Sequence, residues 1–116
     1  MKIRNKDIFN FHAELCRTLS SPKRLMIIAI LAKKEMSVSE LAEIIGVPIA
    51  NVSQHLKSLR DREVVKSRKN GQNVYYSLTD SRMIDACNAL RAVLLDKMKA
   101  RGRIAGDIDP EGIIEE

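Results

Sequence analysis

Apolar side chains recur every three or four residues in several stretches of the chain, which is the spacing of a helix with one buried face. Residues 7–19 form the first such stretch. A second, nearly all-apolar helix is predicted to begin at Pro22, because Ser21-Pro22 has the composition of a helix start. Ser37 and Glu40 have the spacing of a capping box, so a third helix is expected over roughly 38–45.

A short turn, Gly46-Val47-Pro48, separates this third helix from a fourth that contains residues 51–61. The turn is too short to be a domain linker, so we expect the two helices to be close neighbours at a steep angle. The fourth helix has one apolar face to bury, and its opposite face carries Asn, Gln, His and Ser in place of the usual mixture of Lys and Glu. That polar face needs an explanation.

After residue 61 the pattern changes to the alternation that is typical of strands. Residues 64–68 and 73–78 alternate, and Asn70-Gly71 between them is a signal for a hairpin with a type I′ turn. We therefore predict a two-stranded ribbon with a basic and polar tip. A last helix is expected to begin near Thr79-Asp80, either of which can cap it, and its long apolar stripe is a candidate for burial against a second copy of the chain.

The length of 116 residues, with 45% hydrophobic and 30% charged residues, is typical of one globular domain. The longest apolar run, residues 25–32, is far too short to cross a membrane, and no membrane partner is expected. Two cysteines cannot form a disulfide framework for a chain of this size, so the reducing cytoplasm is the expected compartment.

Charge is distributed unevenly along the chain. All 20 basic residues and 10 of the 15 acids lie in residues 1–104, a net charge of +10, whereas residues 105–116 hold five acids and no base. We therefore predict a folded basic domain over residues 1–101 and an acidic flexible tail over residues 102–116. Six basic residues fall within 57–69, which fits either a solvated face or nucleic-acid binding.

A steep helix-turn-helix followed by a basic hairpin is the arrangement of a winged helix, whose second helix enters the major groove of double-stranded DNA. The predicted fold is α+β, mostly helical, with a two-stranded β-wing. Amide side chains can pair with adenine, and a methyl group can contact thymine. The predicted base contacts are therefore Ala50, Asn51, Ser53, Gln54 and His55, although Ser53 and His55 can also serve the packing of the motif.

Contacts with the DNA backbone are expected from long and polar side chains farther along this helix and on the hairpin. On the helix these are Lys57, Ser58 and Arg60. On the hairpin, whose tip can lie over the neighbouring minor groove, they are Arg68, Lys69, Asn70 and Gln72.

Three segments in this order, SSPKRLMIIAIL, SVSELAEIIGVPIANVSQHLKSLRDREVV and KNGQNVYYSL, resemble the ArsR/SmtB-type winged-helix repressors over about residues 13–95. The resemblance implies a homodimer formed by the first and last helices, which binds a pseudo-palindromic operator and leaves it when an inducer arrives. The implied interface residues are Leu15, Met83, Cys87, Leu90 and Leu94.

The metal sites known in this family are incomplete in this chain. Members that sense soft metals have a Cys-x-Cys pair where this chain has Ser37 and Ser39. Members with a zinc site on the last helix have Asp-x-His and a later His pair, and the matching residues here are Asp80, Arg82, Val93 and Asp96. One ligand does not make a site, so neither a metal nor a cofactor is predicted.

Thiol chemistry is the remaining candidate for sensing. Persulfide-sensing members have cysteines where this chain has Ala29 and Leu95, so that site is also missing. His12, Cys16 and Cys87 could instead converge across the dimer as a redox, persulfide or metalloid sensor. The two cysteines can equally be small buried hydrophobic residues, and the sequence identifies no inducer.

Other functional classes fit the sequence less well. The chain has neither a Gly-rich phosphate loop nor a nucleophile motif, so an enzyme is not expected. A non-specific architectural DNA-binding protein stays open, because charge alone would be enough for it. A winged helix that contacts protein and not DNA is a further alternative.

Overall fold

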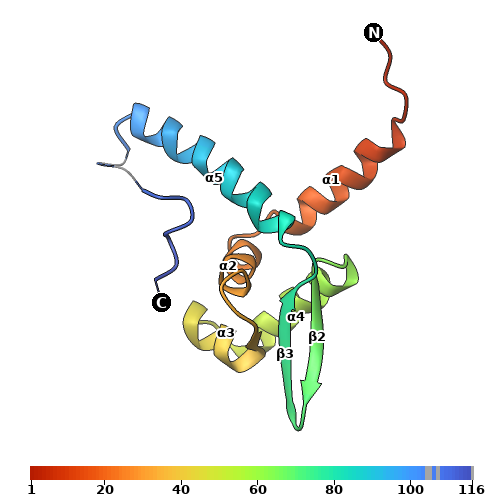
Figure 1. Cartoon of the computed structure of the whole chain (residues 1–116), viewed down its shortest axis with the longest axis vertical. Coiled ribbons are helices and arrows are strands. Elements are labelled where there is room, and N and C mark those ends of the chain that lie inside the picture. Colours follow the sequence, from red (N-terminus) through yellow and green to blue (C-terminus); the bar gives the residue numbers. More distant parts are fainter. Residues whose placement is uncertain (104–105, 107, 116) are drawn as a thin grey trace. The chain divides into compact units, whose positions relative to one another are not determined.

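A computed structural model describes residues 1–103, 106 and 108–115 of the protein (Figure 1). The α+β class and the winged helix-turn-helix order are confirmed, with one short strand, β1, in addition to the predicted elements. In chain order the elements are α1 (Asp7–Leu19), α2 (Pro22–Leu31), β1 (Met36–Ser37), α3 (Val38–Ile45), α4 (Ile49–Asp61), β2 (Val65–Asn70), β3 (Asn73–Leu78) and α5 (Arg82–Ala100).

These elements belong to two compact units, residues 1–79 and residues 80–116. The first unit contains α1 to β3, and the second contains α5 and the segment that follows it. The predicted boundary between a folded domain and a flexible tail at residue 102 stays a prediction. Two acids of that predicted tail, Asp107 and Glu116, lie outside the described residues.

The core of the first unit is mainly aliphatic. Helices α2, α3 and α4 pack on one another, and α2 and α3 also contact β3. The largest fully buried side chains come from all three helices and from the start of the wing: Ile27, Ile28, Leu41, Val52, Leu56, Leu59, Val64 and Val65. The predicted cap of α2 is present, since the Ser21 hydroxyl accepts a hydrogen bond from the Arg24 backbone N–H at 3.4 Å.

The wing is the antiparallel hairpin of β2 and β3, and β1 adds a third strand on the other side of β3. Met36 of β1 lies opposite Tyr76. The pattern of apolar residues did not predict β1, because a strand of two residues is too short to alternate. Its residues also lead directly into the capping box of α3, which dominated the prediction at this point.

The turn of the hairpin differs from the predicted one. Asn70 lies opposite Asn73, so the two loop residues are Gly71 and Gln72, and not Asn70 and Gly71. Gly71 has a φ of 65°, whereas Gln72 is not among the described residues with positive φ. A type I′ turn needs positive φ at both loop positions, and positive φ at the first alone is the pattern of type II′. The type I′ prediction was therefore wrong, because the glycine occupies the first loop position.

Helix α1 is joined to the rest of the first unit through its C-terminal half. The Glu14 carboxylate pairs with Arg62 at 3.0 Å, and the Thr18 carbonyl accepts a hydrogen bond from Arg24 at 3.0 Å. Residues 7–13 are all exposed, and they include three large apolar side chains: Ile8, Phe9 and Phe11. The N-terminal half of α1 therefore presents an apolar surface that the rest of the first unit leaves uncovered.

In the second unit, Asp80 accepts a hydrogen bond from the Arg82 backbone N–H at 2.9 Å. The residue at the N-cap position of α5 is Ser81, which makes no side-chain capping hydrogen bond, so the predicted cap by Thr79 or Asp80 was wrong. The described part of the C-terminal segment lies beside this helix, where Arg91 donates to the Asn88 side chain at 2.9 Å and to the Pro110 carbonyl at 3.3 Å. None of the helices in the described part of the chain is long and apolar enough to span a membrane.

Candidate nucleic-acid interface

The helix-turn-helix is built from local signals that the sequence carries. Ser37 and Glu40 form the predicted capping box, with hydrogen bonds of 3.1 and 3.2 Å in the two directions. Gly46 ends α3 with a φ of 80°, and the backbone N–H groups of Gly46 and Val47 both donate to the Ala42 carbonyl. Pro48 then provides the extended residue before α4, so the chain turns within three residues.

Helix α4 has a fully buried face and an exposed face of small and polar side chains. Val52, Leu56 and Leu59 are at most 1% exposed and fix the rotation of the helix about its axis. Four of the five predicted base contacts lie on the exposed side: Ala50, Asn51, Ser53 and Gln54. Within the described chain, none of their polar side chains has a hydrogen-bond partner. This face is therefore free to hydrogen-bond with another molecule.

The fifth predicted contact, His55, lies differently, because it is only half-exposed. Its Nδ1 atom accepts a hydrogen bond from Arg24 Nε at 3.0 Å, which joins α4 to the first turn of α2. Burial lowers the pKa of His55 below its ordinary value of 6.5, and the charges of Arg24 and Lys23 lower it further. His55 therefore has a packing role in the motif, and its prediction as a base contact is untested.

The three residues of α4 that were predicted to contact the DNA backbone differ in exposure and in ion pairing. Lys57 is exposed and pairs with Asp61 at 3.2 Å, one helical turn away. Ser58 is half-buried, whereas Arg60 is exposed and has no ion-pair partner in the described structure. Exposed pairs of this kind contribute little to stability, so the Lys57 ammonium can readily exchange its partner.

Three of the four wing residues that were predicted to contact DNA are exposed at the tip of the hairpin: Lys69, Asn70 and Gln72. The fourth, Arg68, is engaged within the protein. Its guanidinium binds both oxygens of Glu35 and lies 5.2 Å from the centre of the Tyr75 ring. Arg68 lowers the pKa of Glu35, and this paired guanidinium holds the wing against the segment before β1.

The residues predicted for a dimer interface are divided between the two units. In the first unit, Leu15 is half-buried on α1. In the second, Met83 is half-buried and Cys87 is buried on α5, while Leu90 and Leu94 are 73% and 54% exposed. Val93, which precedes Leu94 on the same helix, is also 54% exposed. Each unit therefore presents large apolar side chains to solvent, and the assignment of these residues to an interface stays a prediction.

The residues predicted for thiol sensing have different surroundings. His12 and Cys16 are exposed on one face of α1, at positions i and i+4. Cys87 lies in the second unit, and burial raises the pKa of its thiol, which disfavours the reactive thiolate. Among the described residues, no group of three His, Cys, Asp or Glu side chains could hold a metal ion.

Asp80 and Arg82 form an ion pair at the start of α5, with Arg82 Nη2 lying 2.7 Å from Asp80 Oδ2. Hydrogen bonds from the Arg82 side chain and backbone lower the pKa of Asp80 to about 2. The resemblance places the first two zinc ligands of some family members at these positions. Here, the second ligand is replaced by a cation that neutralises the first.

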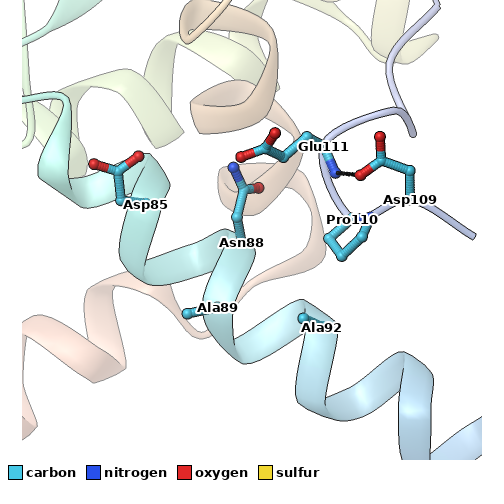
Figure 2. A pocket seen from close by; sticks show the side chains of 7 residues that line it. All are labelled: Asp85, Asn88, Ala89, Ala92, Asp109, Pro110 and Glu111. Carbon is cyan, nitrogen blue, oxygen red and sulfur yellow. Dashed lines mark hydrogen bonds between the residues drawn. The ribbon is translucent and has the colours of Figure 1, made fainter.

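A hollow of about 330 Å³ lies in the second unit between α5 and the C-terminal segment (Figure 2). Three carboxylates line it, those of Asp85, Asp109 and Glu111, together with Asn88, Ala89, Ala92 and Pro110. The sequence did not predict this hollow. Its negative lining is unsuited to a DNA phosphate, so we do not include it in the candidate interface.

Two features of the interface were missed by sequence reasoning. Arg24 gave no signal, because a single cation near the start of an apolar helix is usually solvated. Ile49 is the first residue of α4 and is 53% exposed, so it presents an apolar side chain next to Ala50. Spacing could not have revealed this exposure, because Ile49 precedes Val52 by three residues and therefore continues the stripe of Val52, Leu56 and Leu59.

Comparison with known proteins agrees with this geometry. Residues 21–67 match the model of the family described as bacterial regulatory protein, arsR family. The biofilm growth-associated repressor of Xylella fastidiosa is 37% identical over 87 residues, which are 75% of this chain and 76% of that protein. The crystal structure of Rv0081 from M. tuberculosis superposes with a TM-score of 0.76 at 30% identity, covering 84% of this chain and 98% of the other.

A third similar structure is a homodimeric winged helix-turn-helix DNA-binding domain from Mycobacterium bovis, itself described as a possible ArsR-family regulator. It has a TM-score of 0.67 and 25% identity, and the match covers 84% of this chain and 89% of that one. The matched segment contains α2, α3 and α4, the elements that position the exposed polar face. The chain belongs to the arsR family of bacterial transcriptional regulators.

Proposed function

We propose that this regulator is a homodimeric, sequence-specific DNA-binding repressor that is released from a pseudo-palindromic operator by an inducer. Helix α4 enters the major groove, and the tip of the β2–β3 wing lies over the neighbouring minor groove. The protein acts by binding and not by catalysis, as its membership of a family of regulators indicates.

The exposed face of α4 is the observation that carries this proposal. Asn51, Ser53 and Gln54 offer donors and acceptors that nothing in the described chain satisfies, and the buried face opposite holds them in a fixed orientation. Asn and Gln can each form two hydrogen bonds with an adenine edge in the major groove. Ile49 and Ala50 precede them and can contact thymine methyl groups, so the first two turns of α4 can distinguish base pairs.

The charge of the chain supports the same function. Residues 1–104 carry a net charge of +10, which favours attraction to phosphates. Near the interface, Arg60 and Lys69 are exposed and have no ion-pair partner in the described structure, so they are available to bind the DNA backbone. Such contacts fix the register of a protein on the duplex and carry no sequence information.

A homodimer is supported by the apolar surfaces on two helices. Ile8, Phe9 and Phe11 are exposed on α1, and Leu90 and Leu94 are exposed on α5. Clusters of exposed apolar side chains mark interaction sites. The similar domain from Mycobacterium bovis is homodimeric. In a symmetric dimer, two copies of α4 would read half-sites about one helical turn apart, which explains the expectation of a pseudo-palindrome.

A binding selection on random duplex DNA tests the proposal directly. We expect enrichment of a two-fold symmetric sequence that binds about 10³-fold or more tightly than a scrambled duplex at the same salt concentration. Equal affinity for both duplexes would instead identify a non-specific architectural protein. No binding to either would favour a winged helix that contacts another protein.

The inducer is proposed separately from the DNA-binding function. Thiol modification at Cys16 and Cys87 is one candidate, supported by the exposure of Cys16 and weakened by the raised pKa of Cys87. A ligand at the apolar surfaces of α1 and α5 is the other. Titration of the protein on its selected duplex with thiophilic metals, arsenite, persulfides and oxidants separates the two, because only the first candidate requires a thiol.

A further inference from the structure

Arg24 connects three elements of the first unit through one side chain. Its Nη1 atom donates to the Thr18 carbonyl at 3.0 Å, and its Nε atom donates to His55 Nδ1 at 3.0 Å. Thr18 lies in the last turn of α1, where a carbonyl has no partner within its own helix. The guanidinium thus caps α1 from the first turn of α2 and at the same time contacts the middle of α4.

The contact with Arg24 determines where His55 carries its proton. A guanidinium can only donate hydrogen bonds, so Nδ1 must accept with its lone pair. Neutral His55 is therefore protonated at Nε2, which makes Nε2–H a donor. Burial and the charges of Arg24 and Lys23 lower the pKa of this imidazole, and thereby favour the neutral form.

The Nε2 atom has no hydrogen-bond partner in the described chain. No buried polar side-chain atom in the described structure lacks a partner, so Nε2 must be in contact with solvent. It belongs to the same helix as the exposed polar face, one residue after Gln54. The structure therefore has a donor of fixed position and fixed protonation at the edge of the candidate interface.

We propose that Arg24 is a positioning residue for DNA recognition, which holds His55 so that its Nε2–H donates a hydrogen bond to an acceptor on the DNA. This inference rests on the proposed function and extends it. Arg24 itself does not contact DNA: both of its hydrogen bonds go to the protein, and its effect on DNA is transmitted through His55. The acceptor is a base edge or a phosphate oxygen, both of which accept from a neutral imidazole N–H.

The protonation state can be measured on the unmodified protein. Proton–nitrogen correlation spectra of the ¹⁵N-labelled full chain distinguish the two neutral forms of each imidazole, and His12 provides a second signal for comparison. We expect His55 to be protonated at Nε2 in the free protein at neutral pH. Protonation at Nδ1 would overturn the proposal, whether or not any variant folds.

Two substitutions of His55 then separate its two nitrogens. Glutamine places an amide donor near the position of Nε2, whereas asparagine places an acceptor near the position of Nδ1. If Nε2–H donates to DNA, His55→Gln should retain most of the affinity for the selected duplex. His55→Asn should lose about tenfold for each half-site, as expected for one hydrogen bond, or about 100-fold for the symmetric dimer. Equal or better binding by His55→Asn would show that only the contact with Arg24 matters.

The role of Arg24 is tested by a double-mutant cycle. Arg24→Gln should let His55 mix its two neutral tautomers and weaken DNA binding up to about tenfold for each half-site, but it should have little further effect in a His55→Asn background. Lys23→Gln is the matched control, since it removes a neighbouring charge and leaves the hydrogen bonds in place. If Arg24→Gln weakens binding equally in both backgrounds, Arg24 acts independently of His55 and the proposal is wrong.

Comparison of matched and scrambled duplexes identifies the acceptor and separates this inference from the proposed function. A loss in His55→Asn that is confined to the matched duplex indicates a base edge, and an equal loss on both indicates a phosphate. If the unmodified protein itself shows no preference for any duplex, the proposed repressor function fails. The spectra then still decide whether Arg24 fixes the protonation of His55.

Discussion

Gln54→Ala tests the proposed recognition surface with little risk to the fold. The side chain is exposed and makes no hydrogen bond within the described chain, so its removal should leave the free energy of unfolding almost unchanged. On DNA, removing a bidentate pair of hydrogen bonds with one base costs about 1 to 3 kcal/mol. A symmetric dimer makes this pairing twice, so affinity for the selected operator should fall by about 2 to 6 kcal/mol, or at least about 30-fold.

Lys69→Ala is the matched comparison for this substitution. Lys69 lies at the wing, is exposed and has no ion-pair partner in the described structure. If it binds a phosphate, its removal should weaken matched and scrambled duplexes to a similar extent. The slope of log affinity against log salt concentration should also become shallower by about 0.9 for each phosphate that the variant no longer neutralises, or about 1.8 in a dimer.

Fluorescence anisotropy titrations of both variants at several salt concentrations measure these effects. We expect Gln54→Ala to lose its preference for the matched duplex and to keep the salt dependence of the unmodified protein. The reasoning would be refuted if Gln54→Ala weakened both duplexes equally and flattened the salt dependence. A large loss of stability in urea unfolding would also refute it, because Gln54 would then have a structural role.

The apolar surfaces, the titration of His55 and the cysteines each give a further prediction. Leu90→Glu should give monomers in sedimentation experiments and poor affinity for the operator, since a charge would enter the proposed interface, whereas Asp96→Lys, at an exposed position on the opposite side of the same helix, should leave a dimer. The lowered pKa of His55 means that the folded state resists its protonation, so the free energy of unfolding should fall as pH drops below 6.5. His55→Asn should remove that part of the pH dependence in urea titrations. The double variant Cys16→Ser, Cys87→Ser should bind operator normally; if it still releases DNA with the same thiol reagents as the unmodified protein, thiol sensing is excluded.

The helices of this fold could be predicted because their signals are local. Ser21-Pro22 begins α2, and Ser37 and Glu40 form the capping box of α3, each within four residues of sequence. Gly46 ends α3 with the positive φ that only glycine adopts easily. The exposed and buried faces of α4 also follow from spacing alone. Patterns of this length predict which side chains face solvent, and hence most of the candidate interface.

The contacts between elements could not be predicted, because they join residues that are far apart in the sequence. Arg24 and His55 are 31 positions apart, and Arg68 and Glu35 are 33 apart. Neither pair has a distinctive spacing, so Arg68 was predicted to contact DNA and no role was predicted for Arg24. Their roles depend on how α2 packs against α4 and on how the wing lies beside β1, which are properties of the folded chain.

The positions that hold ligands in other members of the family have structural roles in this protein. Ser37 stands where a soft-metal ligand would be, and its hydroxyl caps α3. Asp80 retains a carboxylate, but Arg82 neutralises it and lowers its pKa to about 2. A metal at either place would have to displace a capping hydrogen bond or an arginine, and too few further ligands are present to compensate. The proposed inducer should therefore act elsewhere, and the exposed apolar surfaces of α1 and α5 are the places where a ligand would alter the proposed dimer directly.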